Sequence, residues 1–286
     1  MHQDRFFVGL DKVEPPYTLR QMITVSVIIP LFEAQATLPR ALASVRKAGL
    51  DLSEIEIILA SDDGESYDAF APSDISHRLT EIGPVQSGPG PTRNRALVQA
   101  TGTFVAFLDA DDTWEAGYLA ELLPIAARQG VAFGPTQILN EDARPVLRTC
   151  PTGVLDLEEF GRTGASHHPL VRSDWAGPFE NRPSQDILHA IEVLALAGGS
   201  LPTGTSAYEI HLRAQSVSRV AGYADRLDRI YQEIETSIKD GQSRVPAALK
   251  QRAAQVYAQK RQLNQAYLKH GSGQSFYDFI ANSKTK

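Results

Sequence analysis

A run of apolar and aromatic residues at 104–108 is followed at once by three carboxylates, Asp109, Asp111 and Asp112. The run predicts a buried strand, and carboxylates crowded at its end need a counter-charge because unpaired charge is costly to bury. A divalent cation would supply that charge, since Mg²⁺ is typically held by one or two carboxylates together with substrate phosphates. The same residues also suit a turn in which Asp112 or Thr113 caps a following helix. Both interpretations stay open on these residues alone.

Other polar residues stand at the ends of predicted strands. Apolar runs at 23–30 and 54–60 predict strands buried on both faces, the first ending at Pro30 and the second running into Asp62-Asp63. Further strands and helices are expected in alternation, at 37–49, 79–82, 93–100, 104–108, 118–128 and 131–139. This alternation predicts an α/β fold with an open sheet, in which ligands bind beyond the carboxyl ends of the strands.

The chain after residue 140 falls into two regions. Residues 140–185 lack periodicity and are interpreted as facing a substrate, and a helix is expected at 185–197. From about residue 225 the pattern is helical, with two apolar stripes separated by Gly241 and Pro246, which predicts a helical hairpin. The predicted division is an N-terminal arm (1–22), an α/β domain (23–222) with halves at 23–112 and 113–222, and a helical extension (223–286).

Composition narrows the classes of protein. The formal net charge of −6 argues against a nucleic-acid partner, which needs a basic face. A single cysteine, Cys150, excludes an internal disulfide and suits a reducing compartment. No run approaches the ~20 apolar residues of a membrane helix, and the N-terminus lacks the order of a signal peptide. A cytoplasmic protein is expected, with peripheral contact at the inner membrane surface as the alternative.

Four segments resemble those of family 2 glycosyltransferases with the GT-A fold. They are the strand and helix at 25–45, the turn at 60–64, the glycine-rich loop through the Asp cluster at 88–112, and the Tyr-x-x-His…Ser-x-Ser segment at 208–218. An isolated Asp-x-Asp is a weak signal, but four segments in the family's order are specific. The resemblance implies a Rossmann-like, mixed and mostly parallel sheet flanked by helices, with a C-terminal helical extension. It also implies inverting, metal-dependent transfer of a sugar from a nucleoside-diphosphate sugar to a hydroxyl group, as in the synthesis of surface polysaccharides.

The resemblance implies contacts to the nucleotide-sugar donor, for which a UDP-sugar is favoured. Asp63 would accept a hydrogen bond from the nucleobase, and Pro30 would line the base pocket. Arg93 and Asn94 would face the nucleotide from the first turn of a helix, and Asp109 would contact the ribose or the sugar. Without the resemblance, each residue has a structural explanation. Asp63 could belong to a turn, Pro30 could end a strand, and Arg93 could lie on the solvated surface of a helix.

The resemblance also implies a site for Mn²⁺ or Mg²⁺. Asp111 matches the metal ligand, and His211 matches the late histidine that reaches the diphosphate or the metal. Asp112 would assist or only cap a helix, and an isolated histidine such as His211 is more often structural. The cation would neutralise the diphosphate as it leaves.

Inversion requires a base near the acceptor hydroxyl. The family uses an Asp, often within a Glu-Asp pair that starts a helix, and Asp186 occupies the matching place although Gln185 replaces the Glu. Glu180 is the second candidate and Asp174 the third. A carboxylate at this position also complements the dipole of the helix that it starts.

Two other classes compete with a transferase acting on a glycan, lipid-linked or small-molecule hydroxyl. A nucleotidyltransferase or a dinucleotide-binding dehydrogenase would need a glycine-rich loop after the first strand, where this chain has the glycine-free 31–35. A non-catalytic sugar-binding or scaffold protein is suggested only by Gln185. The C-terminal helices are expected to pack on the domain or to form a homo-oligomer contact.

Overall fold

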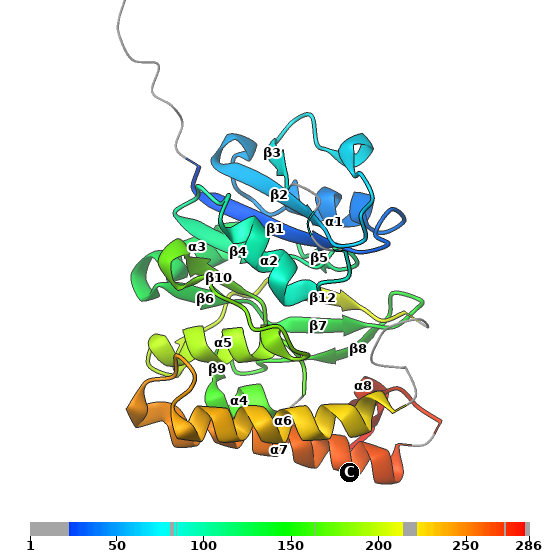
Figure 1. Cartoon of the computed structure of the whole chain (residues 1–286), viewed down its shortest axis with the longest axis vertical. Coiled ribbons are helices and arrows are strands. Elements are labelled where there is room, and N and C mark those ends of the chain that lie inside the picture. Colours follow the sequence, from blue (N-terminus) through cyan, green and yellow to red (C-terminus); the bar gives the residue numbers. More distant parts are fainter. Residues whose placement is uncertain are drawn as a thin grey trace, which may run out of the picture.

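The computed structural model describes residues 23–80, 83, 85–162, 164–213, 222–271 and 273–283. The predicted arm at 1–22 and the serines Ser216 and Ser218 lie outside these residues. A large sheet forms one end of the molecule and a pair of long antiparallel helices forms the other, with two smaller sheets between them (Figure 1).

The large sheet has six strands in the order β3-β2-β1-β4-β10-β6. Their bounds are β1 (Val25–Leu31), β2 (Ile55–Ser61), β3 (Ser76–Leu79), β4 (Phe104–Phe107), β6 (Val131–Phe133) and β10 (Pro169–Arg172). The first four strands are parallel, and β10 runs antiparallel to both of its neighbours, β4 and β6. The predicted α/β fold with a mixed, mostly parallel sheet is thereby confirmed.

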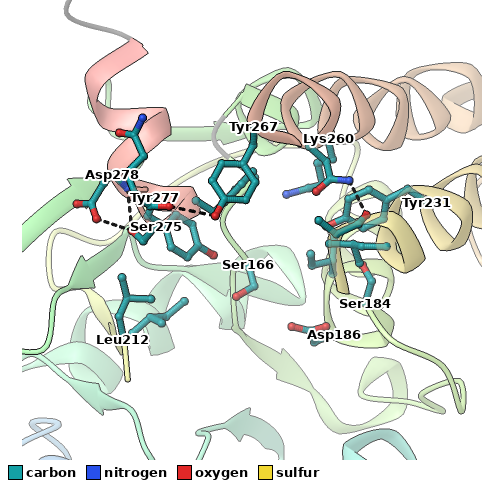
Figure 2. A pocket seen from close by; sticks show the side chains of 18 of the residues that line it. Ser166, Ser184, Asp186, Leu212, Tyr231, Lys260, Tyr267, Ser275, Tyr277 and Asp278 are labelled. Carbon is teal, nitrogen blue, oxygen red and sulfur yellow. Dashed lines mark hydrogen bonds between the residues drawn. The ribbon is translucent and has the colours of Figure 1, made fainter. Parts of the chain in front are cut away.

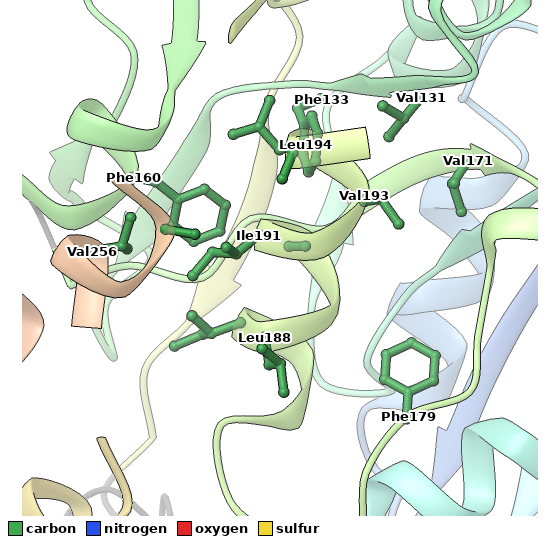
Figure 3. Close-up of a cluster of buried hydrophobic side chains, with 14 of the residues drawn as sticks. Val131, Phe133, Phe160, Val171, Phe179, Leu188, Ile191, Val193, Leu194 and Val256 are labelled. Carbon is green, nitrogen blue, oxygen red and sulfur yellow. The ribbon is translucent and has the colours of Figure 1, made fainter. Parts of the chain in front are cut away.

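Both faces of the large sheet are buried, which explains the continuous apolar runs of its central strands. Along β1, Val25, Val27 and Ile29 face one core and Ile28 faces the other, as the alternation of side chains along a strand requires. Helices α1 (Leu38–Val45) and α3 (Tyr118–Gln129) cover the first face. Helices α2 (Pro89–Leu97) and α5 (Gln185–Leu196) cover the second, where Figure 3 shows Leu188, Ile191 and Leu194 of α5 in the core. The domain therefore has three layers.

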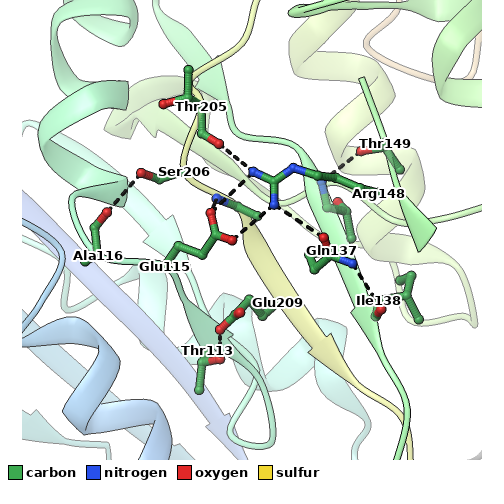
Figure 4. Close-up of polar contacts among 12 residues, drawn as sticks. Thr113, Glu115, Ala116, Gln137, Ile138, Arg148, Thr149, Thr205, Ser206 and Glu209 are labelled. Atoms are coloured by element: carbon green, nitrogen blue, oxygen red, sulfur yellow. Dashed lines mark hydrogen bonds and ion pairs between the residues drawn. The ribbon is translucent and has the colours of Figure 1, made fainter. Parts of the chain in front are cut away.

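Two smaller sheets extend the second half of the chain. One has the order β5-β12-β7-β8, with β5 (Thr113–Trp114), β7 (Thr136–Leu139), β8 (Pro145–Arg148) and β12 (Tyr208–His211), and the other pairs β9 (Val154–Asp156) with β11 (Ser200–Pro202). Arg148 holds the four-stranded sheet together by pairing with Glu115 at 3.1 Å and donating to the Thr205 carbonyl at 2.6 Å (Figure 4). Short 3₁₀ turns lie at Leu52–Glu54, Asp68–Phe70, Ser173–Trp175 and Ala247–Leu249.

Local expectations differ from the structure in several places. The strand expected at 79–82 is β3 at Ser76–Leu79, and the helix expected at 93–100 begins earlier, as α2 at Pro89. The predicted strand at 131–139 is two strands, because Gly134 and Pro135 break the run and send β6 and β7 into different sheets. Residues 113–114 form the strand β5 instead of starting a helix, and α3 begins only at Tyr118. The region 140–185, expected to be irregular, contains β8, β9, α4 (Leu157–Arg162) and β10.

The C-terminal residues form α6 (Tyr223–Asp240), α7 (Lys250–His270) and a third helix that was not expected, α8 (Phe276–Ser283). The apolar stripe of α6 lies in the same core as α4 and α5, and its residues Ile234 and Ile238 are completely buried. Val256 of α7 contacts this core as well (Figure 3). The stripe that raised the expectation of an oligomer contact is therefore buried within a single chain, and homo-oligomerisation stays a prediction.

Lys260 of α7 is buried beside α4. Its ammonium group donates to the Ala165 carbonyl at 3.0 Å and lies 5.3 Å from the centre of the Phe160 ring. Burial lowers the pKa of Lys260 to about 7, although the negative charge of Asp186 acts in the opposite direction. Within the described residues, no helix has the length and apolar character needed to cross a membrane.

Ile234→Ala is expected to lower the free energy of unfolding by about 2–5 kcal/mol, because it leaves a cavity in the shared core. Urea unfolding followed by tryptophan fluorescence measures this, since Trp114 and Trp175 both lie outside the C-terminal helices. Val98→Ala, at an 87% exposed position, should change the value by less than about 0.5 kcal/mol. An unchanged tryptophan transition in Ile234→Ala would show that the helices unfold independently.

Lys260→Met should change how stability depends on pH. An unfolded lysine keeps its proton to about pH 10.4, whereas the native Lys260 loses it near pH 7. The unfolded state therefore binds more protons across this window, so Lys260 makes the wild-type stability rise with pH. Urea unfolding at pH 7 and pH 9.5 should show a smaller rise for Lys260→Met than for wild type. The exposed Lys269→Met is the control, and an equal rise in both variants would contradict the expectation.

Candidate active site

The three carboxylates lie in the loop after β4, at the carboxyl edge of the large sheet. Arg93, buried in the first turns of α2, forms an ion pair with Asp109. Arg213, just after β12, forms an ion pair with Asp111. Asp112 is buried and accepts a hydrogen bond from the His211 amide at 3.1 Å. Two strand ends and one helix thus converge on this loop.

The carboxylates are electrostatically distinct. Burial would raise the pKa of Asp109, but the charge of Arg93 outweighs it and holds that pKa below its usual value. Burial and the charge of Asp109 raise the pKa of Asp111, although Arg213 opposes this. The pKa of Asp112 is raised well above its usual value by burial and by both neighbouring carboxylates. Burial and mutual repulsion thus favour protonation of Asp111 and Asp112, whereas Arg93 favours the ionised form of Asp109.

Tyr208 of β12 fixes the shape of this loop. Its hydroxyl accepts a hydrogen bond from the Asp109 amide at 3.0 Å and donates to the Asp112 carboxylate. The ring is buried and stacks on His168, with 4.1 Å between ring centres. The late Tyr-x-x-His segment is thus brought directly to the Asp cluster.

His211 is held in one tautomer. The Thr113 hydroxyl donates its only proton to Glu209 at 2.7 Å, as Figure 4 shows, so it accepts at 2.8 Å from Nε2–H of His211. Nδ1 therefore carries the lone pair of the ring. Burial lowers the pKa of His211 to about 4, and the charge of Arg40 acts in the same direction. At neutral pH the imidazole is neutral, the state in which histidine binds metals.

The turn after β2 is occupied by internal hydrogen bonds. Asp62 accepts the amides of Ser87 at 3.0 Å and Gly88 at 2.8 Å, which ties the glycine-rich loop to β2. Asp63 accepts from the Glu33 amide and the Tyr67 hydroxyl, each at 2.7 Å. Burial opposes these bonds, yet they hold the pKa of Asp63 below its usual value. Asp63 is thus an ionised acceptor at the carboxyl edge, three residues after Ala60, which pairs with Pro30 of β1.

Helix α2 connects this edge to the segment before α5. The Asn94 side chain both donates to the Phe179 carbonyl and accepts from its amide, each at 2.8 Å. Gly90 packs against the backbone of Glu180, the residue after Phe179, because a Cβ at position 90 would lie 2.3 Å from the Glu180 carbonyl oxygen. Asn94 and the glycine therefore serve close packing of the chain, and Arg93 positions Asp109. Direct nucleotide contacts of Arg93 and Asn94 stay predictions.

Asp186 lies in the first turn of α5, half-buried, in the wall of a cavity of about 1020 Å³. The same cavity is lined by the Asp cluster, His168, His211 and Lys260, and Figure 2 shows Asp186 and Lys260 in its wall. The other candidate bases do not line it: Glu180 pairs with Arg182, and Asp174 pairs with Arg172. The cavity therefore favours Asp186 among the three.

A hard divalent cation suits these donors. In the part of the chain that the structure describes, no three His, Cys, Asp or Glu residues form a ready metal cluster. Asp111 and His211 line the cavity, and the carboxylates there are destabilised by mutual repulsion, which an added cation relieves. Mg²⁺ commonly takes one or two carboxylates and completes its shell with phosphate oxygens and water. The residues present fit a cation that arrives with a diphosphate.

Sequence reasoning missed three contributors to the site. Arg213 and Lys260 come from distant segments, and His168 lines the cavity and stacks on Tyr208. A short apolar run beside His168 was the sole local signal for β10, which carries the chain back into the large sheet. Thr113 was considered as a helix cap, whereas it orients His211.

Comparisons with known proteins agree with this geometry. Residues 26–148 match the model of glycosyl transferase family 2. The Escherichia coli UDP-Glc:alpha-D-GlcNAc-diphosphoundecaprenol beta-1,3-glucosyltransferase WfgD is 28% identical over 123 residues, which are 42% of this chain and 48% of WfgD. The chain thus spans about half the length of this curated relative. The family match ends at residue 148, before Asp186 and His211.

Solved structures extend the likeness of the fold over most of the chain. TarS 1–349 of Staphylococcus aureus in complex with UDP-GlcNAc superposes with a TM-score of 0.65 and 17% identity, covering 86% of this chain and 76% of that one. The mannosyltransferase PcManGT of Pyrobaculum calidifontis, in complex with GDP-Man and Mn²⁺, gives a TM-score of 0.55 at 17% identity, with 95% and 83% covered. At these identities the likeness concerns the fold. Together, these comparisons show a GT-A fold in which residues 26–148 match glycosyl transferase family 2.

Proposed function

We propose that this protein transfers a sugar from a nucleoside-diphosphate sugar to a hydroxyl group of a glycan or lipid-linked acceptor, with inversion at the transferred carbon. One observation carries the proposal: Asp109, Asp111, His211 and Asp186 all line a single cavity at the carboxyl edge of the sheet. The relative WfgD is named for transfer from UDP-Glc to a diphosphoundecaprenol-linked sugar, which supports a UDP-sugar and a glycan-type acceptor.

Binding of the donor is assigned to the nucleotide half of the domain. Asp63 and Pro30 are proposed to receive the nucleobase at the ends of β2 and β1, and Asp109 to contact the ribose or the sugar. Asp111 and His211 would hold Mn²⁺ or Mg²⁺, which supplies charge neutralisation for the departing diphosphate. Asp109 stays ionised because Arg93 lowers its pKa, so it can accept hydrogen bonds from hydroxyl groups.

Asp186 is the proposed base. Its carboxylate would take the proton from the acceptor hydroxyl as that oxygen attacks the sugar carbon, while the bond from this carbon to the diphosphate breaks on the opposite face. Its place in the first turn of α5 puts the carboxylate close to unpaired helix amides, which favour negative charge.

Asp111→Asn should remove the metal-dependent part of nucleotide binding. We expect UDP with Mn²⁺ to raise the melting temperature of the wild type more than UDP alone, and this difference to vanish in the variant because an amide is a weaker ligand. GDP, CDP and dTDP in parallel identify the base. Asp142→Asn, in an exposed loop, is the control. A full Mn²⁺ effect in Asp111→Asn would exclude Asp111 as a ligand.

Asp186→Asn should separate binding from chemistry. The variant is expected to keep the thermal shift with UDP-glucose or UDP-GlcNAc and Mn²⁺, because Asp186 does not touch the nucleotide in this assignment. Release of UDP by slow transfer to water should fall by about 10²–10⁴-fold, the usual contribution of a positioned base. Glu180→Gln serves as the matched carboxylate control. Wild-type release in Asp186→Asn, or its loss in Glu180→Gln, would overturn the assignment.

A further inference from the structure

The cavity extends well beyond the Asp cluster. Its near end holds Asp111 and Asp186, whereas its far end is walled by α7 and α8, which contribute Tyr267, Phe276 and Tyr277. Its volume of about 1020 Å³ lies at the upper limit of ordinary ligand pockets, roughly 300–1,000 Å³. The near end alone faces the donor and the base, so the far end has room for a second ligand.

The far end combines aromatic rings with amide groups. Half-buried Tyr267 and Phe276 pack edge to face with 5.4 Å between ring centres, and Phe276 packs in the same way on Tyr277. Figure 2 shows Tyr267 and Tyr277 on the side of the cavity opposite Asp186. Gln274 and Asn282 line the same end, where the Asn282 amide donates a hydrogen bond to the Gln274 side-chain oxygen at 3.1 Å. Aromatic faces suit the C–H faces of sugar rings, and amides both donate to and accept from hydroxyl groups.

This wall is fixed to the rest of the domain. Ile280 of α8 is only 2% exposed and packs with Ile138 of β7 and Leu147 of β8. The hydroxyl of Ser275 and the carboxylate of Asp278 close the start of α8 through a hydrogen bond of 2.5 Å. The aromatic rings are therefore held in place before any ligand arrives, which lowers the entropic cost of binding.

From these observations we infer that α7 and α8 complete the acceptor site, and that the far end of the cavity binds a carbohydrate segment of the acceptor against Tyr267 and Tyr277. The inference rests on the proposed transfer reaction, because the bound segment must present its hydroxyl to Asp186. The mixture of rings and amides favours a sugar over a polyprenyl chain, which would need a continuous apolar wall. The C-terminal helices thus select the acceptor, beyond packing on the domain.

Saturation-transfer NMR on the full chain with UDP and Mn²⁺ tests this inference. The probes are methyl glycosides and disaccharides of glucose, galactose, N-acetylglucosamine and N-acetylgalactosamine. At least one disaccharide is expected to bind, and Tyr277→Ala should weaken it about tenfold, whereas Tyr277→Phe keeps the ring and the affinity. Farnesyl diphosphate, which has a lipid chain and a diphosphate but no sugar, should not displace the disaccharide.

A matched control comes from the same helix. Ser283→Ala changes an exposed side chain of α8 that does not line the cavity, so it should leave the affinity for the sugar unchanged. Absence of binding by all of the sugars, equal binding by Tyr277→Ala, or displacement by farnesyl diphosphate would overturn the inference. The thermal shift with UDP and Mn²⁺ is measured on the same samples. If that shift is intact while the sugars fail, the acceptor inference is wrong and the donor assignment stands; if the shift is absent, the proposed function itself fails.

Discussion

Mutual repulsion among Asp109, Asp111 and Asp112 is the constraint on which the site depends. Three carboxylates within four residues at the edge of a buried strand are unfavourable without compensation, since burial and like charges both oppose ionisation. Arg93 and Arg213 compensate two of them, and the Tyr208 hydroxyl bridges Asp109 and Asp112. The remaining repulsion between ionised carboxylates is a feature of the native fold that a bound cation would relieve.

The sequence predicted the parts of the fold whose signals are local. Each apolar run that became β1, β2 or β4 is buried on both faces, so its composition alone marks it as a central strand. The Asp cluster could be placed at the carboxyl edge because it directly follows such a run. The apolar stripe of α6 could likewise be predicted from the sequence, although it packs into the core of the same chain and not against a second copy.

Other parts depend on contacts between distant residues, which leave no local pattern. Strand β10 has only four residues, and it is a strand because β4 and β6 pair with it on both sides. Lys260 is indistinguishable from a surface lysine of a helix until α4 is packed against it. Within the cavity, the candidate base Asp186 could be ranked above Glu180 only once the walls were known. Helix α8 was missed because it is short and follows a glycine-containing turn.

The contact between α2 and the segment before α5 has a mechanical consequence. The Asn94 side chain forms two hydrogen bonds with the Phe179 backbone, one to its carbonyl and one from its amide. Gly90 allows the Glu180 backbone to approach more closely than any residue with a side chain would. The neighbouring Arg93 forms an ion pair with Asp109. Helix α2 therefore connects the Asp cluster to the segment that precedes α5. In the proposed reaction, the spacing between the donor and the acceptor would then be set by the folded chain before either binds. Since a displacement of about 1 Å can cost a hundredfold in rate, a methyl group at position 90 would push the Glu180 backbone away and slow the proposed reaction without touching a substrate.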